Sequence, residues 1–116
     1  MIKLFLDDIR NPPDDTWTVA RTAEEAQRLL SEQDVDMASL DHDLGECSDC
    51  AAKRGYEDPR FTCPHRMNGY RLTLWMAETG HWPRQKPTVH SANPVGAANM
   101  RATIDRYWAP RESETR

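Results

Sequence analysis

Three polar clusters in this sequence each follow directly after a run of apolar residues. The first is LFLDD at residues 4–8, the second is SLDHD at residues 39–43, and the third is VHSAN at residues 89–93. Carboxylates that converge on one site repel each other unless a cation lies among them, and hard divalent ions prefer carboxylate oxygens and water as ligands. If the clusters meet, we expect a Mg²⁺ or Mn²⁺ site whose ligands are Asp7, Asp8, Asp41 and Asp43.

The same clusters contain groups suited to proton transfer and to phosphate binding. A histidine side chain ordinarily titrates near neutral pH, so either His42 or His90 is a candidate general acid or base beside Asp41. Backbone amides at the start of a helix favour anions, and Asn93-Pro94 is typical of such a start. The candidate phosphate ligands are Arg10, Ser91 and Asn93. The alternative is that these residues are turn formers, helix caps and a packed histidine.

A second candidate metal site lies between the second and third clusters. Its C-x-x-C pair and C-P-H triplet supply three thiolates and an imidazole, which is the ligand set of a tetrahedral structural zinc. The predicted zinc ligands are Cys47, Cys50, Cys63 and His65. Free thiols or an interchain disulfide are the alternatives. Four filled positions would leave none open for catalysis, so this zinc would stabilise a loop that has few apolar residues.

Length and charge exclude several classes of protein. The chain has 116 residues, a net charge of -4 and a pI near 5.5. It therefore fits one domain and lacks the basic surface that generic nucleic-acid binding requires. The apolar run at residues 2–6 is too short for a signal sequence or a membrane span, so we expect a cytoplasmic protein that does not bind membranes.

Strands and helices alternate along the chain. Apolar or β-branched runs predict strands, and capping residues such as Thr22 and Asn93 predict helix starts. The expected strands are residues 2–6, 17–20, 35–40 and 88–92. The expected helices begin near residues 22, 69 and 93 and end near residues 31, 79 and 108. We expect one domain over residues 1–108 with a zinc-binding insertion at 45–68, followed by a flexible tail at 109–116.

This alternation predicts a parallel sheet whose strands end at a common edge, where ligands collect. Asp7, Asp41 and His90 would then share one crevice. The last strand, at residues 88–92, would lie at the edge of the sheet, and unpaired edges are usually covered. Either the C-terminal segment or a second copy of the chain would cover it, so a homodimer is one of two alternatives.

The arrangement resembles a response-regulator receiver domain, with Asp41 in the place of the phospho-accepting aspartate. An ordinary receiver has a helix after its first strand, where this chain has Pro12-Pro13, and a fifth strand that supplies a lysine, which is absent here. The motifs LFLDDIRNPP, SLDHDLG and HSANPVGAANM are more closely similar to the cyclic-phosphate-processing receiver-like family. The resemblance implies a truncated, flavodoxin-like α/β fold with three layers: about four parallel strands, with helices on both faces, plus the cysteine-rich insertion.

The resemblance also implies a function. We expect a metal-dependent phosphoesterase that hydrolyses a cyclic phosphate on a ribose, in a nucleotide or an ADP-ribose derivative, so its partner is a small phosphorylated ligand. One alternative is a signalling receiver that is phosphorylated on Asp41. Another is a non-catalytic interaction module that the zinc loop stabilises.

Overall fold

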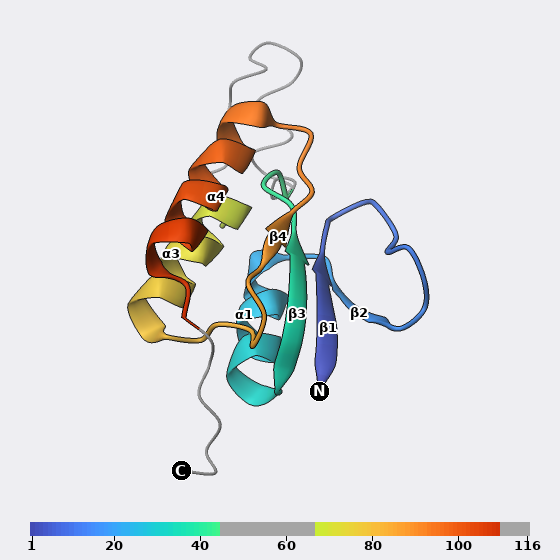
Figure 1. Cartoon of the computed structure of the whole chain (residues 1–116). Coiled ribbons are helices and arrows are strands. Elements are labelled where there is room, and N and C mark those ends of the chain that lie inside the picture. The colour runs from blue at the N-terminus through green and yellow to red at the C-terminus, as the bar shows by residue number, and fades with distance from the viewer. Residues whose placement is uncertain (45–66, 110–116) are drawn as a thin grey trace, which may run out of the picture.

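The computed structural model describes residues 1–44 and 67–109, which form one parallel sheet and three helices (Figure 1). The strand order is β2-β1-β3-β4, and every pairing between neighbours is parallel. The strands are β1 (Ile2–Leu6), β2 (Trp17–Ala20), β3 (Val35–Leu40) and β4 (Thr88–Val89). The expectation of four parallel strands in a receiver-like α/β fold is therefore confirmed.

Strand β4 is shorter than the expected residues 88–92. The His90 amide still donates to the Leu40 carbonyl at 3.0 Å, but the chain then leaves the sheet. Pro94 lacks an amide hydrogen and begins the next helix, so the segment between His90 and Pro94 turns instead of extending the ladder.

Local capping signals fix where the three helices begin and end. The helices are α1 (Ala23–Glu32), α3 (Gly69–Thr79) and α4 (Pro94–Tyr107). The side chains of Thr22, Asn68 and Asn93 each accept a hydrogen bond from an amide in the first turn, which satisfies a donor that the helix leaves free. Gly80 ends α3 in the left-handed region at φ 76°, a conformation that glycine adopts without steric cost.

All three helices cover the same face of the sheet (Figure 1). The connections from β2 to β3 and from β3 to β4 cross the sheet in the same direction, so right-handed crossovers place α1 and α3 on one side. Helix α4 packs against α3 and joins that layer. The shared core contains fully buried residues from the sheet and from each helix: Leu4, Leu6, Leu40, Leu30, Leu72, Met76, Met100 and Ile104.

The predicted third layer is wrong for the described part of the chain. No helix in residues 1–44 or 67–109 covers the opposite face of the sheet, which carries Phe5, Trp17 and Met37. A crossover helix between β1 and β2 would cover that face, but this connection contains Pro12-Pro13 and is a loop. The described chain also has no fifth strand that a further helix could follow.

The free edge of β4 is covered in part by the protein's own side chains. The Arg101 guanidinium, on α4, donates to the Val89 carbonyl at 3.0 Å. The inner side of α4 includes the buried Thr103, whereas Tyr107 at the end of the helix is 50% exposed. In the ranges that the structure describes, no helix has the length and apolarity that crossing a membrane requires. The predicted insertion at 45–68 lies almost wholly outside the described residues, as does nearly all of the predicted tail.

Candidate functional site

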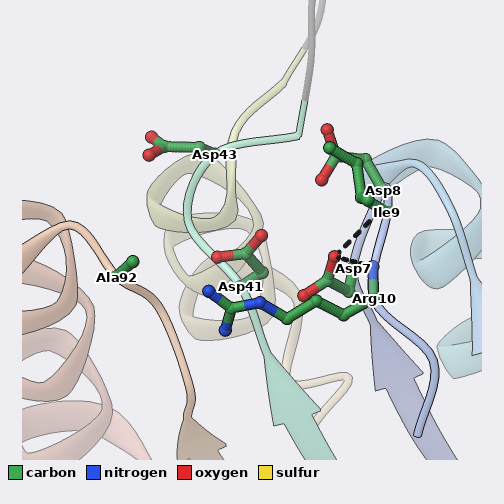
Figure 2. A pocket seen from close by; sticks show the side chains of 7 residues that line it. All are labelled: Asp7, Asp8, Ile9, Arg10, Asp41, Asp43 and Ala92. Atoms are coloured by element: carbon green, nitrogen blue, oxygen red, sulfur yellow. Dashed lines mark hydrogen bonds between the residues drawn. The ribbon is translucent and has the colours of Figure 1, made fainter.

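A pocket of about 250 Å³ opens at the carboxyl ends of the strands (Figure 2). Its walls come from the loops after β1, β3 and β4, which are far apart in the sequence. The residues that line it are Asp7, Asp8, Ile9, Arg10, Asp41, Asp43 and Ala92. Ligands of parallel α/β sheets collect at this edge, so the pocket lies where the topology predicts one.

Three carboxylates meet in this pocket. Asp7 and Asp8 follow β1, and Asp41 follows β3. These strands pair in parallel, and the Asp41 amide continues the pairing by donating to the Leu6 carbonyl at 3.0 Å. One carboxylate oxygen from each of these aspartates lies within 4.8 Å of those from the other two. The structure thus brings together three of the four predicted metal ligands.

The fourth predicted ligand, Asp43, lines the pocket but lies outside this group. Its Oδ1 atom is 2.8 Å from His42 Nδ1 and accepts a hydrogen bond from Asn93 Nδ2 at 3.4 Å. Figure 2 shows its side chain on the opposite side of the pocket from Asp8, with the carboxylate pointing away from Asp8. Asp43 is therefore placed to assist at the rim of the pocket.

Crowding of negative charge changes how easily two of these carboxylates ionise. Burial raises the pKa of Asp8, and the charges of Asp41, Asp7 and Asp43 raise it further. Burial and the charge of Asp7 likewise raise the pKa of Asp41, although hydrogen bonds from the His42 amide and the Ser91 side chain oppose this effect. Both carboxylates would be more stable as anions with a cation among them.

Asp7 behaves differently because its neighbours stabilise its charge. Burial acts to raise its pKa, but hydrogen bonds from the Arg10 and Ile9 amides and from His90 outweigh this effect and lower the pKa below its ordinary value. The two amides donate to Oδ1 at 2.8 and 2.9 Å. Asp7 is therefore a carboxylate that the fold holds ionised and in one orientation.

The donor set fits a hard divalent ion. Mg²⁺ is usually bound by one or two carboxylates together with water and phosphate oxygens, and carboxylate and water ligands suit Mn²⁺ as well. The group of Asp7, Asp8 and Asp41 offers only carboxylate oxygens, and the pocket is open enough to admit water and a ligand.

The two predicted acid–base residues lie beside the pocket, and neither lines it. His90 Nε2 is 3.0 Å from Asp7 Oδ2 and its Nδ1 is 2.7 Å from Ser39 Oγ, so both ring nitrogens have partners. His42 Nδ1 contacts Asp43, while its Nε2 has no hydrogen-bond partner among the described residues.

The His42 ring packs against the first turn of α4. A Cβ atom at Gly96 would lie 2.5–2.7 Å from three atoms of this ring, which is closer than side chains approach. A similar restriction holds at Gly69, where a Cβ atom would lie 2.0 Å from the Asp41 carbonyl oxygen. Both helices therefore approach the loop after β3 only because glycine occupies these positions.

The three predicted phosphate ligands are in different situations. Arg10 lines the pocket, and one of its guanidinium nitrogens donates to the His90 carbonyl at 3.1 Å. Ser91 Oγ hydrogen-bonds Asp41 and accepts from the Asn93 amide, and the Asn93 side chain caps α4. Among the described residues, the other donors of the Arg10 guanidinium have no partner, whereas Ser91 and Asn93 mainly organise the loop around the pocket.

Some residues of the site were not predicted. Ile9 and Ala92 line the pocket although their apolar side chains gave no chemical signal. Ser39 supports His90 from within β3, and its one signal was a hydroxyl in the otherwise apolar end of a strand, Ala38-Ser39-Leu40. The predicted zinc ligands Cys47, Cys50, Cys63 and His65 lie outside the described residues.

Comparison with known proteins places the chain in a family. A family model described as "Cyclic-phosphate processing Receiver domain" matches residues 2–106, which is nearly the whole chain. Neither the curated proteins nor the solved structures contain a significant match.

Proposed function

This chain belongs to the cyclic-phosphate processing receiver domain family, and we propose that it is a metal-dependent phosphoesterase. Its substrate would be a cyclic phosphate on the ribose of a nucleotide or of an ADP-ribose derivative. The observation that carries the proposal is the group of Asp7, Asp8 and Asp41, whose oxygens lie within 4.8 Å of one another in an open pocket. Such a group is costly to assemble without a cation.

Asp7, Asp8 and Asp41 would hold the metal, and Asp43 would assist from the rim. A bound Mg²⁺ or Mn²⁺ supplies positive charge that neutralises phosphate oxygens and makes phosphorus more electrophilic. The prior hydrogen bonding of Asp7 means that this carboxylate needs no rearrangement to bind. The pKa values of Asp8 and Asp41 are raised because their negative charges are unfavourable in the metal-free pocket. A bound cation would therefore stabilise these two carboxylates most.

Arg10 is the best candidate for direct contact with the phosphate. Its guanidinium group lies in the pocket wall, beside Asp41 in Figure 2, and presents donors in a planar fork that matches phosphate oxygens. Ser91 and Asn93 support the phosphate site indirectly, through the loop that they brace. The pocket volume of about 250 Å³ is slightly below the ~300–1,000 Å³ typical of sites that enclose a whole ligand. This size suits a ligand whose cyclic phosphate enters the pocket while the rest of the molecule stays outside.

The reaction requires two proton movements. Water attacks phosphorus and loses a proton, the bond from phosphorus to one ribose oxygen breaks, and that oxygen gains a proton to become a hydroxyl. The product is a ribose phosphomonoester. His42 is the better of the two histidines for this task, because its Nε2 has no partner within the described residues while Asp43 orients its Nδ1.

The test is turnover of a panel of cyclic phosphates by purified protein with Mg²⁺ or Mn²⁺. Activity should require the metal and should be lost in Asp8→Asn and Asp41→Asn. His42→Ala should lower turnover by ~10²–10⁴-fold without unfolding the protein, the range that general acid–base catalysis contributes. If the wild type leaves the whole panel intact with either metal, the proposal is wrong.

A signalling receiver is the second candidate, and the position of Asp41 favours it. This carboxylate follows β3 beside the acidic pair after β1 and lines the open pocket, where a phosphoryl donor could reach it. Arg10 would replace the missing lysine as the cation at the pocket. Incubation with acetyl phosphate followed by intact mass separates the two functions, since a stable added phosphoryl group that Asp41→Asn loses favours signalling.

A further inference from the structure

His90 connects the acidic pocket to the face of the sheet that lies opposite the described helices. It follows β4 directly, with its ring between Asp7, at the end of β1, and Ser39, on β3. The ring also stacks on Phe5, with 4.6 Å between centroids and 5° between planes. Its position is therefore fixed both by stacking and by two hydrogen bonds at opposite ends of the ring.

The carboxylate of Asp7 determines which nitrogen of His90 carries hydrogen. An aspartate carboxylate is ordinarily ionised at neutral pH, and this one accepts hydrogen bonds from the Arg10 and Ile9 amides at 2.8 and 2.9 Å. An ionised carboxylate only accepts hydrogen bonds, so His90 Nε2 must be the donor across the 3.0 Å contact. At the other end of the ring, Nδ1 lies 2.7 Å from Ser39 Oγ, so this hydroxyl holds the ring in the orientation that directs Nε2 at Asp7.

These contacts leave His90 little capacity to exchange protons with a ligand. Nε2 already carries a hydrogen that is directed at Asp7, and Nδ1 faces Ser39, which is not among the residues that line the pocket. They also limit Asp7. Of the four lone pairs on its two oxygens, the Ile9 and Arg10 amides use two and His90 uses a third, so one lone pair on Oδ2 remains.

We propose that His90 is a positioning residue, which with Ser39 fixes the Asp7 carboxylate so that a single lone pair of Oδ2 is presented to a divalent cation. The inference rests on the proposed metal-dependent function but concerns a different residue from the proton-transfer group. Partners that orient a metal ligand in this way typically change metal affinity by ~10–100-fold.

The test compares two substitutions that separate stacking from hydrogen bonding. His90→Phe keeps an aromatic ring against Phe5 and loses both hydrogen bonds, whereas His90→Gln places an amide donor near the position of Nε2. Mn²⁺ affinity, measured by electron paramagnetic resonance, should fall by ~10–100-fold in His90→Phe and recover most of that loss in His90→Gln. Ser39→Ala should give an intermediate loss. Equal Mn²⁺ affinity in wild type and His90→Phe would overturn the proposal.

A second measurement needs only the wild type and no metal. Nitrogen chemical shifts of the His90 ring should show hydrogen on Nε2, the nitrogen that faces Asp7. Hydrogen on Nδ1 alone would overturn the inference even if the protein binds Mn²⁺. If the wild type binds no Mn²⁺, the proposed function fails, while the ring shifts still decide how His90 and Asp7 are arranged.

Discussion

Asp7 and Asp41 lie at the ends of two neighbouring parallel strands, and the charge of one affects the ionisation of the other. Burial and the negative charge of Asp7 together raise the pKa of Asp41. Asp7 itself has a lowered pKa, since hydrogen bonds from two amides and His90 outweigh its burial. The fold thus holds the charge of Asp7 in place and makes the charge of Asp41 unfavourable, so we expect an added cation to stabilise the protein.

Asp8→Asn should stabilise the metal-free protein. The substitution removes a charge that lies near Asp7, Asp41 and Asp43 and keeps a side chain of similar shape. Two unit charges ~4 Å apart repel by at least ~1 kcal/mol, which corresponds to a rise in Tm of ~4 °C or more for a domain of this size. Thermal unfolding in a chelator at pH 7 measures this change.

The same variant should respond less to Mg²⁺. Wild-type Tm should rise with added Mg²⁺, whereas Asp8→Asn should show a smaller rise or none, because one ligand has lost its charge. Asp105→Asn is the matched control, since this carboxylate pairs with Lys86 away from the pocket. A variant that is less stable than wild type without metal would contradict the crowding argument.

The stability of the metal-free protein should increase as the pH falls from 7 toward the ordinary aspartate value of 3.8. Asp8 and Asp41 have higher pKa values folded than unfolded, first through burial, so the folded state binds their protons more tightly and gains stability as they protonate. Asp7 has a lower pKa folded than unfolded, so its ionised form stabilises the protein, and this stabilisation is lost as the pH falls below 3.8. Urea denaturation at a series of pH values tests this, and Mg²⁺ should remove the increase.

The positions of the helices and strands, and the convergence of the aspartates in one pocket, were predictable because they depend on local sequence signals and on one rule of sheet topology. Capping residues such as Thr22 and Asn93 mark helix starts, and the ends of parallel strands share an edge, so Asp8 and Asp41 had to approach each other. The single helical layer was missed because the expectation followed the receiver resemblance, although Pro12-Pro13 already excluded one crossover helix.

Contacts between distant side chains were not predictable from spacing. Neither Ser39 nor Gly96 belongs to a motif that points to its partner, yet Ser39 contacts His90 and Gly96 contacts the His42 ring. Such pairs depend on strand register and on how closely α4 approaches the sheet, which the sequence pattern does not specify. The roles of the two histidines could therefore be separated only from the structure.

Gly69→Ala should destabilise the protein although it improves intrinsic helix propensity by ~1 kcal/mol. The added Cβ atom would lie 2.0 Å from the Asp41 carbonyl oxygen, and backbone there cannot move without displacing the pocket. Overpacking of this kind costs ~1–3 kcal/mol or more. Denaturant unfolding measures the loss, with exposed Ala98→Gly in α4 as a control for helix propensity. Equal or greater stability than wild type would show that α3 can shift freely.

Arg10→Gln should weaken phosphate binding more than it affects turnover. The guanidinium group lines the pocket and donates to the His90 carbonyl, so its loss removes charged donors without removing a metal ligand. A hydrogen bond to a charged group contributes ~1.5–3 kcal/mol, which predicts a rise in KM of ~10–100-fold. Inhibition by inorganic phosphate should weaken in parallel. Arg101→Gln, whose guanidinium contacts Val89 instead, should leave KM unchanged.

The zinc prediction concerns Cys47, Cys50, Cys63 and His65, and elemental analysis tests it independently of the acidic pocket. Protein purified without chelator should contain about one zinc per chain, and Cys50→Ser should contain little, because a structural zinc uses four protein ligands. Zinc that stabilises a loop should also raise Tm, so a strong chelator should lower the Tm of wild type but not that of Cys50→Ser.

If freshly reduced, chelator-free protein contains no zinc, the cysteines are free thiols or form an interchain disulfide, and non-reducing electrophoresis distinguishes these two alternatives. If Cys50→Ser abolishes binding to a protein partner while Asp41→Asn does not, the zinc loop is the functional surface and the phosphoesterase proposal loses its support.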